Sequence, residues 1–157
     1  MGFSLAGAVV SLVILAPNAL LIVFRPIDSP PLTHPPRPLA WLERGGQALC
    51  LVVPALTGRE PGDAWWLAAV IASIAVYLGL WARYLATGRR IGSLYAPLGP
   101  IPVPMALFPI AAFLFAAGWL GSWWIALAAV ILAAGHIPLA AAVSRALERT
   151  TRTPPPS

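Results

Sequence analysis

Five long apolar stretches, separated by short loops rich in proline or arginine, take up most of this chain. They cover residues of about 2–24, 39–56, 64–84, 104–119 and 123–143. About 20 apolar residues suffice for a helix to cross the hydrocarbon core of a bilayer, and the fourth stretch is close to the lower limit. The pattern predicts an all-α, polytopic integral membrane protein with a bundle of five transmembrane helices. We expect one domain over residues 1–149 and a mobile tail over 150–157.

Composition limits the alternatives. Hydrophobic residues make up 59% of the chain and charged residues 10%, whereas a soluble domain has about 25% charged residues. The single cysteine, Cys50, excludes an intrachain disulfide and a cysteine-cluster metal site. His34 lies in a proline-rich loop over 25–38 with no second ligand at metal-binding spacing, so no metal or other cofactor is expected. The arginines lie at the ends of apolar runs, which argues against a nucleic-acid partner.

The second apolar stretch is unusual because it carries a polar stripe. Glu43, Gln47, Cys50 and Pro54 follow one another at intervals of four, three and four residues, which places them on one helical face. Polar side chains are costly in hydrocarbon, so this face should turn toward the other helices. We expect Glu43 to have a polar or cationic partner there, with Arg83, Asn18 and His136 as the candidates.

The distribution of arginine predicts the orientation. With five spans, one side of the membrane holds nine arginines and the other side holds only Arg59; the nine are Arg25, Arg37, Arg44, Arg83, Arg89, Arg90, Arg145, Arg149 and Arg152. Positively charged residues accumulate on the cytoplasmic side of membrane proteins. The prediction is a multi-pass protein of the cell inner (plasma) membrane, with its N-terminus outside and its C-terminus in the cytoplasm.

In this topology the polar residues of the helices fall at one depth, near the cytoplasmic side. Five of these residues, which come from four different spans, form the candidate ligand-binding site: Asn18, Glu43, Gln47, Tyr84 and His136. Residues that only pack would have no reason to agree in depth. Trp81, at the same end as Tyr84, is typical of a tryptophan that anchors a helix at the membrane interface.

A second candidate site lies at the start of the fourth span. Proline-rich residues 99–103 should be non-helical, and Pro104 suits the first turn of the following helix. The N-terminus of a helix attracts anions. We therefore predict that an anionic lipid headgroup or ligand binds beside it, held by Arg83, Arg89 and Arg90.

Three functions agree with these patterns. The favoured one is a binding, transporting or sensing membrane bundle whose ligand is a small molecule or anionic lipid on the cytoplasmic side. The second is a non-catalytic accessory subunit, as a homo-oligomer or within a membrane complex, because no catalytic constellation is recognisable. The third is an intramembrane enzyme in which Glu43 and His136 serve as base and acid.

Overall fold

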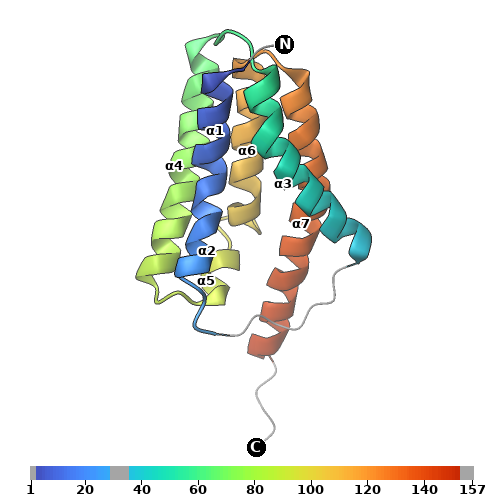
Figure 1. The fold of residues 1–157 in the computed structure, drawn as a ribbon. Helices are drawn as coiled ribbons and strands as arrows, with labels where there is room; N and C mark the ends of the chain where they lie inside the picture. The colour runs from blue at the N-terminus through green and yellow to red at the C-terminus, as the bar shows by residue number, and fades with distance from the viewer. Residues whose placement is uncertain (1–2, 29–35, 153–157) are drawn as a thin grey trace, which may run out of the picture.

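The computed structural model describes residues 3–28 and 36–152, and this part of the chain is all-helical (Figure 1). The only β pairing in these residues is an isolated bridge between Leu98 and Ile101. In chain order the elements are α1 (Leu5–Leu15), the 3₁₀ turn η1 (Ala16–Ala19), α2 (Leu20–Val23), α3 (Arg37–Thr57), α4 (Ala64–Ala86), α5 (Ile91–Tyr95), α6 (Pro104–Trp119) and α7 (Trp123–Arg152).

The helices lie side by side around α6, which packs against α1, α4 and α7. The helix α3 crosses this group at an angle and packs on α1 and α7. The main core consists of apolar side chains from these helices, among them Ile14, Val70, Phe113 and Ile125, all nearly or fully buried. The start of α1 and the end of α7 lie at opposite ends of the molecule.

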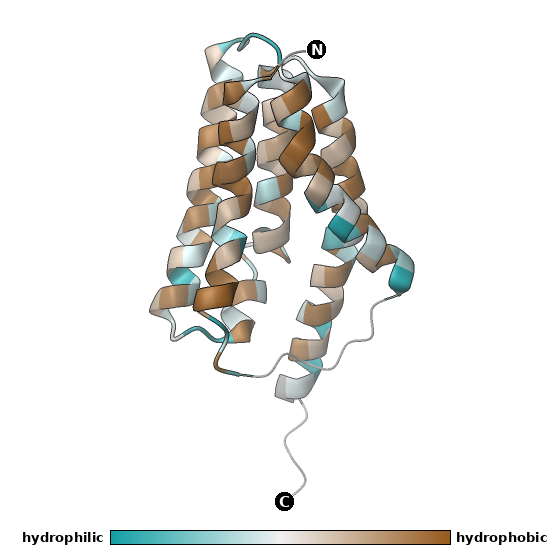
Figure 2. Cartoon of the chain, in the orientation of Figure 1, coloured by the Kyte–Doolittle hydropathy of each residue, from teal (hydrophilic) through white to brown (hydrophobic). Residues whose placement is uncertain are grey.

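Three helical segments are long and apolar enough to cross a membrane: Leu5–Val23, Ala64–Ala86 and Trp123–Thr150. Large apolar side chains remain exposed along these helices, and Figure 2 shows apolar residues over much of their length. The structure thus indicates a membrane protein. Of the two other expected spans, α6 has only 16 residues, and α3 begins with a polar half that contains Glu43, Arg44 and Gln47.

Local breaks in the helices fall where proline predicts them. Residues 99–103 are non-helical and α6 begins at Pro104, both as expected. Pro17 lies in η1, which separates α1 from α2. Proline acts this way because it removes a backbone donor and its ring clashes with the preceding turn.

The last helix is longer than the sequence suggested. We expected its membrane span to end near residue 143 and a mobile tail to cover 150–157, whereas the helix itself continues to Arg152. The nearest proline beyond it is Pro154, so no helix-breaking residue interrupts the chain between 143 and 152. Polar side chains there bond back to the preceding turn, as Thr150 does to the Ala146 carbonyl at 3.1 Å. The rest of the expected tail, 153–157, and His34 lie outside the described residues.

Candidate functional site

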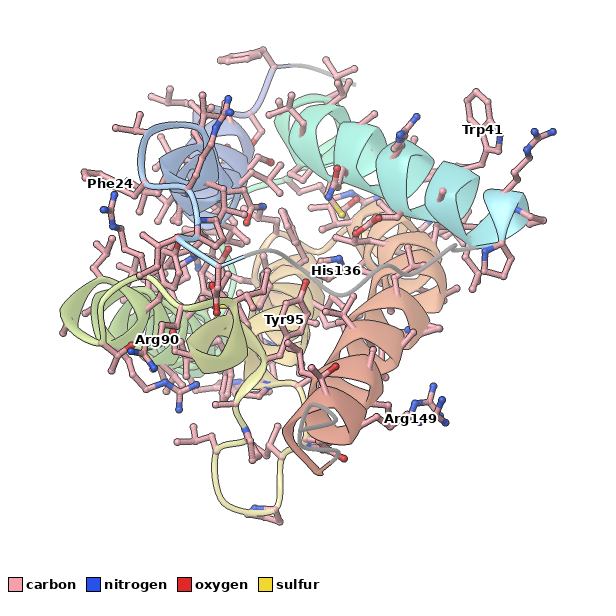
Figure 3. All side chains as sticks on the ribbon, turned by 90° about the horizontal axis from the view of Figure 1, so that it is seen from below. Phe24, Trp41, Arg90, Tyr95, His136 and Arg149 are labelled. Carbon is pink, nitrogen blue, oxygen red and sulfur yellow. The ribbon has the colours of Figure 1, made fainter. Side chains whose placement is uncertain are left out.

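A cavity of about 380 Å³ lies between residues of α3 and α7 on one side and residues of η1, α2, α4, α5 and α6 on the other. The first half of α3 and the second half of α7 lie toward the end of the molecule at which α7 ends (Figure 1). This is also the end of the molecule where Arg90 and Arg149 lie (Figure 3), and we call it the arginine-rich end. On one side the cavity is lined by Asn18, Trp81 and Tyr95, and on the α3–α7 side by Glu43 and His136. Most of the remaining lining is aliphatic.

The polar centre of the cavity is a contact between Glu43 and His136. Glu43 Oε1 and His136 Nδ1 are 2.6 Å apart, a short hydrogen bond between residues 93 positions apart in the chain. The side chains are 26% and 30% exposed, respectively, so both remain partly accessible from the cavity. While the carboxylate is ionised, Nδ1 must carry the shared proton, which leaves Nε2 for a ligand. This pairing agrees with one of the three partners expected for Glu43.

Two glycines bring α3 and α7 close enough for this contact. A Cβ on Gly135 of α7 would collide with the backbone nitrogen of Glu43 and lie 2.8 Å from the Leu39 carbonyl oxygen. A Cβ on Gly46 of α3 would lie 2.6 Å from the backbone nitrogen of Leu132. Small residues at a crossing point allow two helical backbones to approach closely. The crossing therefore places residue 43 directly against the turn that carries His136.

The opposite wall is built on a stack of aromatic side chains along α4. Tyr77, Trp81 and Tyr84 are all at most 3% exposed. Their rings meet edge to face, with centroids 6.4 Å apart for the first pair and 5.7 Å for the second. The Tyr77 hydroxyl donates to Asn18 Oδ1 at 2.8 Å and so fixes this amide at the cavity wall.

Tyr95, the last residue of α5, also lines the cavity. Figure 3 shows its side chain extending toward His136 when the molecule is seen from the arginine-rich end. Burial raises the pKa of the Tyr95 phenol, and the negative charge of Glu43 raises it further. The phenol therefore stays protonated at neutral pH and can act as a hydrogen-bond donor to a ligand.

The structure brings together three of the five predicted ligand-binding residues, namely Asn18, Glu43 and His136. Gln47 is half-buried but does not line the cavity. Tyr84 is fully buried and donates to the Phe24 carbonyl at 2.7 Å, which ties the end of α2 to α4.

Sequence reasoning missed the role of Trp81. We expected an interface anchor, but Trp81 is 3% exposed and lines the cavity. Its spacing from Tyr77 and Tyr84, four residues after one and three before the other, was the available signal, because it places all three on one helical face.

The three arginines of the predicted anion site have different surroundings. Arg83 donates from Nη2 to the carbonyls of Ser93 and Ala96, each at 3.0 Å, and so holds the end of α5. Arg90 is exposed and lines a separate cavity with Asp28. Arg89 adopts a positive φ of 55° in the turn before α5. None of the three lines the cavity beside the start of α6. Anion binding by these arginines stays a prediction.

Comparisons with known proteins provide no relative from which a function for this site could be inferred. No protein-family model, no curated protein and no solved structure matches the chain. Within residues 3–28 and 36–152, no three histidine, cysteine or acidic side chains gather in a way that could hold a metal ion. The function is therefore argued from the cavity and from the residues that line it.

Proposed function

We propose that this protein binds a small molecule in the cavity at the arginine-rich end, as a multi-pass protein of the inner membrane. The observation that carries the proposal is the Glu43–His136 pair in the wall of an otherwise largely apolar cavity. Ligand sites are typically apolar hollows with a few polar groups that orient the ligand. Ionisable residues within membrane helices are costly, and their presence points to function.

The proposal places five crossings in the membrane, with the N-terminus outside and the arginine-rich end in the cytoplasm. The helix α3 can cross the membrane although it contains polar residues, because Glu43 faces the cavity and α7, away from lipid. The short length of α6 also agrees with a crossing helix. Because α6 packs against α1, α4 and α7, much of its surface contacts protein and not lipid. In this arrangement the cavity opens toward the cytoplasm or the inner leaflet.

Native mass spectrometry of the detergent-purified protein tests the binding function. The wild type should retain a small molecule or lipid. Ala142→Phe should abolish this retention, because Ala142 lines the cavity and is only half-buried, so a larger side chain fills the space at little cost to the core. Ala134→Phe is the matched control, since Ala134 lies on the same helix, is exposed and lies outside the cavity.

Two outcomes would contradict the proposal. Equal retention by the wild type and Ala142→Phe would place the bound molecule elsewhere on the protein. A wild type that retains no small molecule, but a stoichiometric protein partner, would favour the accessory-subunit function.

The Glu43–His136 pair favours a second candidate, acid–base chemistry on the bound molecule. A carboxylate that orients an imidazole is a recurrent arrangement for general bases. Glu43→Gln keeps the shape of the side chain but removes its charge. If the protein is an enzyme, this variant should still bind the retained compound but convert it at least about a hundredfold more slowly than the wild type. A pure binding protein would convert it in neither form.

A further inference from the structure

The wall of the cavity that α3 and α7 form carries two accessible hydrogen-bond acceptors. Glu43 Oε1 is bonded to His136 Nδ1, whereas Glu43 Oε2 and His136 Nε2 have no hydrogen-bond partner within the described residues. Neither atom is fully buried, and the two side chains are 26% and 30% exposed, respectively, so a ligand in the cavity that they line can reach both. While Nδ1 carries the shared proton, Oε2 and Nε2 both act as acceptors.

This wall is also negatively charged, and no cation in the cavity compensates the charge. His136 is the only ion-pair partner of Glu43 in the part of the chain that the structure describes. No arginine is among the described residues that line the cavity, and the chain has no lysine. Arg44, next to Glu43 in the sequence, is exposed and lies outside the cavity. With a neutral imidazole, the Glu43–His136 pair therefore carries one uncompensated negative charge.

The two acceptors and the charge select the polar end of a ligand. Glu43 would repel an anion, and a carbonyl oxygen would face two acceptors with no proton between them. A hydroxyl group can donate one proton but leaves the negative charge uncompensated. A protonated amine supplies several N–H donors together with a positive charge, and hydrogen bonds between charged groups are roughly twice as strong as neutral ones.

The other surfaces of the cavity suit a cation with an apolar body. Aliphatic side chains such as Leu39, Leu139 and Met105 line much of the space. Tyr95 adds an aromatic ring near the charge, since burial and then the Glu43 carboxylate raise the pKa of its phenol. The face of an aromatic ring attracts cations. An ammonium group at the Glu43–His136 pair, with an apolar body in the remaining space, matches these surfaces.

We infer that the ligand is a lipophilic amine in its protonated form, whose ammonium group donates to Glu43 Oε2 and His136 Nε2 while its apolar body fills the cavity. This inference rests on the proposed binding function and narrows it to one chemical class. A free amine and the ammonium headgroup of an aminophospholipid share this chemistry. The mass of the molecule that the wild type retains in native mass spectrometry distinguishes the two sources, and a retained molecule without an amino group contradicts the inference.

Phenylbutylamine and phenylbutanol provide a matched pair of probes, because they differ only in a terminal ammonium or hydroxyl group. Both are added to the full chain in a non-ionic detergent at a pH of about 8, at which an alkylamine is charged and free imidazole is neutral. Phenylbutylamine should stabilise the wild type against thermal unfolding at concentrations at least about tenfold lower than phenylbutanol, the factor expected for one charged hydrogen bond. Equal stabilisation by the two probes, or none by the amine, overturns the inference.

Glu43→Gln removes the charge and keeps the shape of the side chain. In this variant the advantage of phenylbutylamine should disappear while the effect of phenylbutanol persists. Glu60→Gln is the matched control, because Glu60 is exposed and lies outside the cavity, so the advantage should remain. An advantage that survives in Glu43→Gln contradicts the inference. The proposed binding function would stand as long as Ala142→Phe still abolishes retention of the native molecule.

A second measurement needs no variant and covers the case in which Glu43→Gln does not fold. A benzophenone that carries an aminomethyl group inserts into nearby C–H bonds under ultraviolet light. Irradiation of the wild type should label Met105 or other residues that line the cavity. Phenylbutylamine should suppress this label at concentrations at least about tenfold lower than phenylbutanol. Labelling confined to the lipid-facing surface, or equal suppression by the two compounds, refutes the assignment of an amine.

Discussion

At the scale of single residues, Glu43 combines a charge with a position in the middle of an apolar structure. One imidazole nitrogen at 2.6 Å is its partner, and 26% of its side chain is exposed. A carboxylate at such a site depends on this hydrogen bond, since an unpaired charge away from water is strongly disfavoured. The partial exposure moderates the effect, because solvent reaching the cavity screens the charge.

The first prediction compares two glutamates. Glu43→Ala should lower the free energy of unfolding by about 1–2 kcal/mol, since it leaves His136 without its partner. Glu60→Ala should change it by less than about 0.5 kcal/mol, because Glu60 is exposed in the loop between α3 and α4. Unfolding in detergent measures both values. Equal and negligible effects would mean that the polar stripe of α3 is incidental.

The second prediction concerns two tyrosine hydroxyls. Tyr84→Phe should cost about 1–2 kcal/mol, because it leaves the Phe24 carbonyl, its acceptor at 2.7 Å, without this donor. Tyr95→Phe is chemically the same change, but the Tyr95 hydroxyl makes no hydrogen bond within the described residues, so stability should change little. If the two variants were equally stable, the link between α2 and α4 would contribute nothing.

At the scale of elements, the crossing of α3 and α7 determines whether the site exists. The two helices touch at Gly46, which is three residues after Glu43, and at Gly135, which directly precedes His136. Backbone contact of this kind cannot be relieved by the rotation of a side chain. A change at the crossing should therefore act on the Glu43–His136 distance as well as on stability.

The third prediction uses two adjacent glycines of α3. Gly46→Ala should destabilise the protein by about 1–3 kcal/mol, because the added methyl group meets the backbone of Leu132. Gly45→Ala should leave stability unchanged or raise it by up to about 1 kcal/mol, since nothing lies within 4 Å of its Cβ and alanine favours the helix. Equal effects in thermal unfolding would show that the crossing tolerates separation.

At the scale of the whole molecule, the two ends differ in chemistry. The end opposite the cavity carries two stacked tryptophan pairs, Trp65 with Trp66 and Trp123 with Trp124, each with ring centroids 3.7 Å apart. Trp65 and Trp123 are more than half exposed. Tryptophan collects at membrane–water interfaces. The arrangement agrees with a tryptophan belt at one surface of the membrane and arginines at the other.

The fourth prediction is the topology. Reporters that are active only in the cytoplasm should work when fused after Ser157, and reporters active only outside should work when fused before Met1. The physical reason is the ninefold excess of arginine on one side. Reporters inserted at Gly62, in the exposed loop between α3 and α4, serve as an internal control and should report the outside. An active external reporter at the C-terminus would refute five crossings in this orientation.

Much of the secondary structure could be predicted from the sequence because its causes are local. Pro104 begins α6, Pro17 interrupts the first helix, and α4 begins at Ala64 as expected. Apolar runs and prolines act within a few residues, so no knowledge of neighbouring helices is needed. The helix α7 continues past the expected end because no proline interrupts the chain between 143 and 152.

The sequence by itself predicted most of the helix boundaries and grouped Asn18, Glu43 and His136, which line one cavity in the structure. Only the tertiary structure decided which side chains meet: Glu43 with His136, Trp81 with the cavity, and Arg83 with backbone carbonyls. Helical periodicity specifies which residues share a face but leaves open how each helix is rotated and crossed against its neighbours. Those angles depend on contacts between residues far apart in the chain, such as the backbone contacts at Gly46 and Gly135.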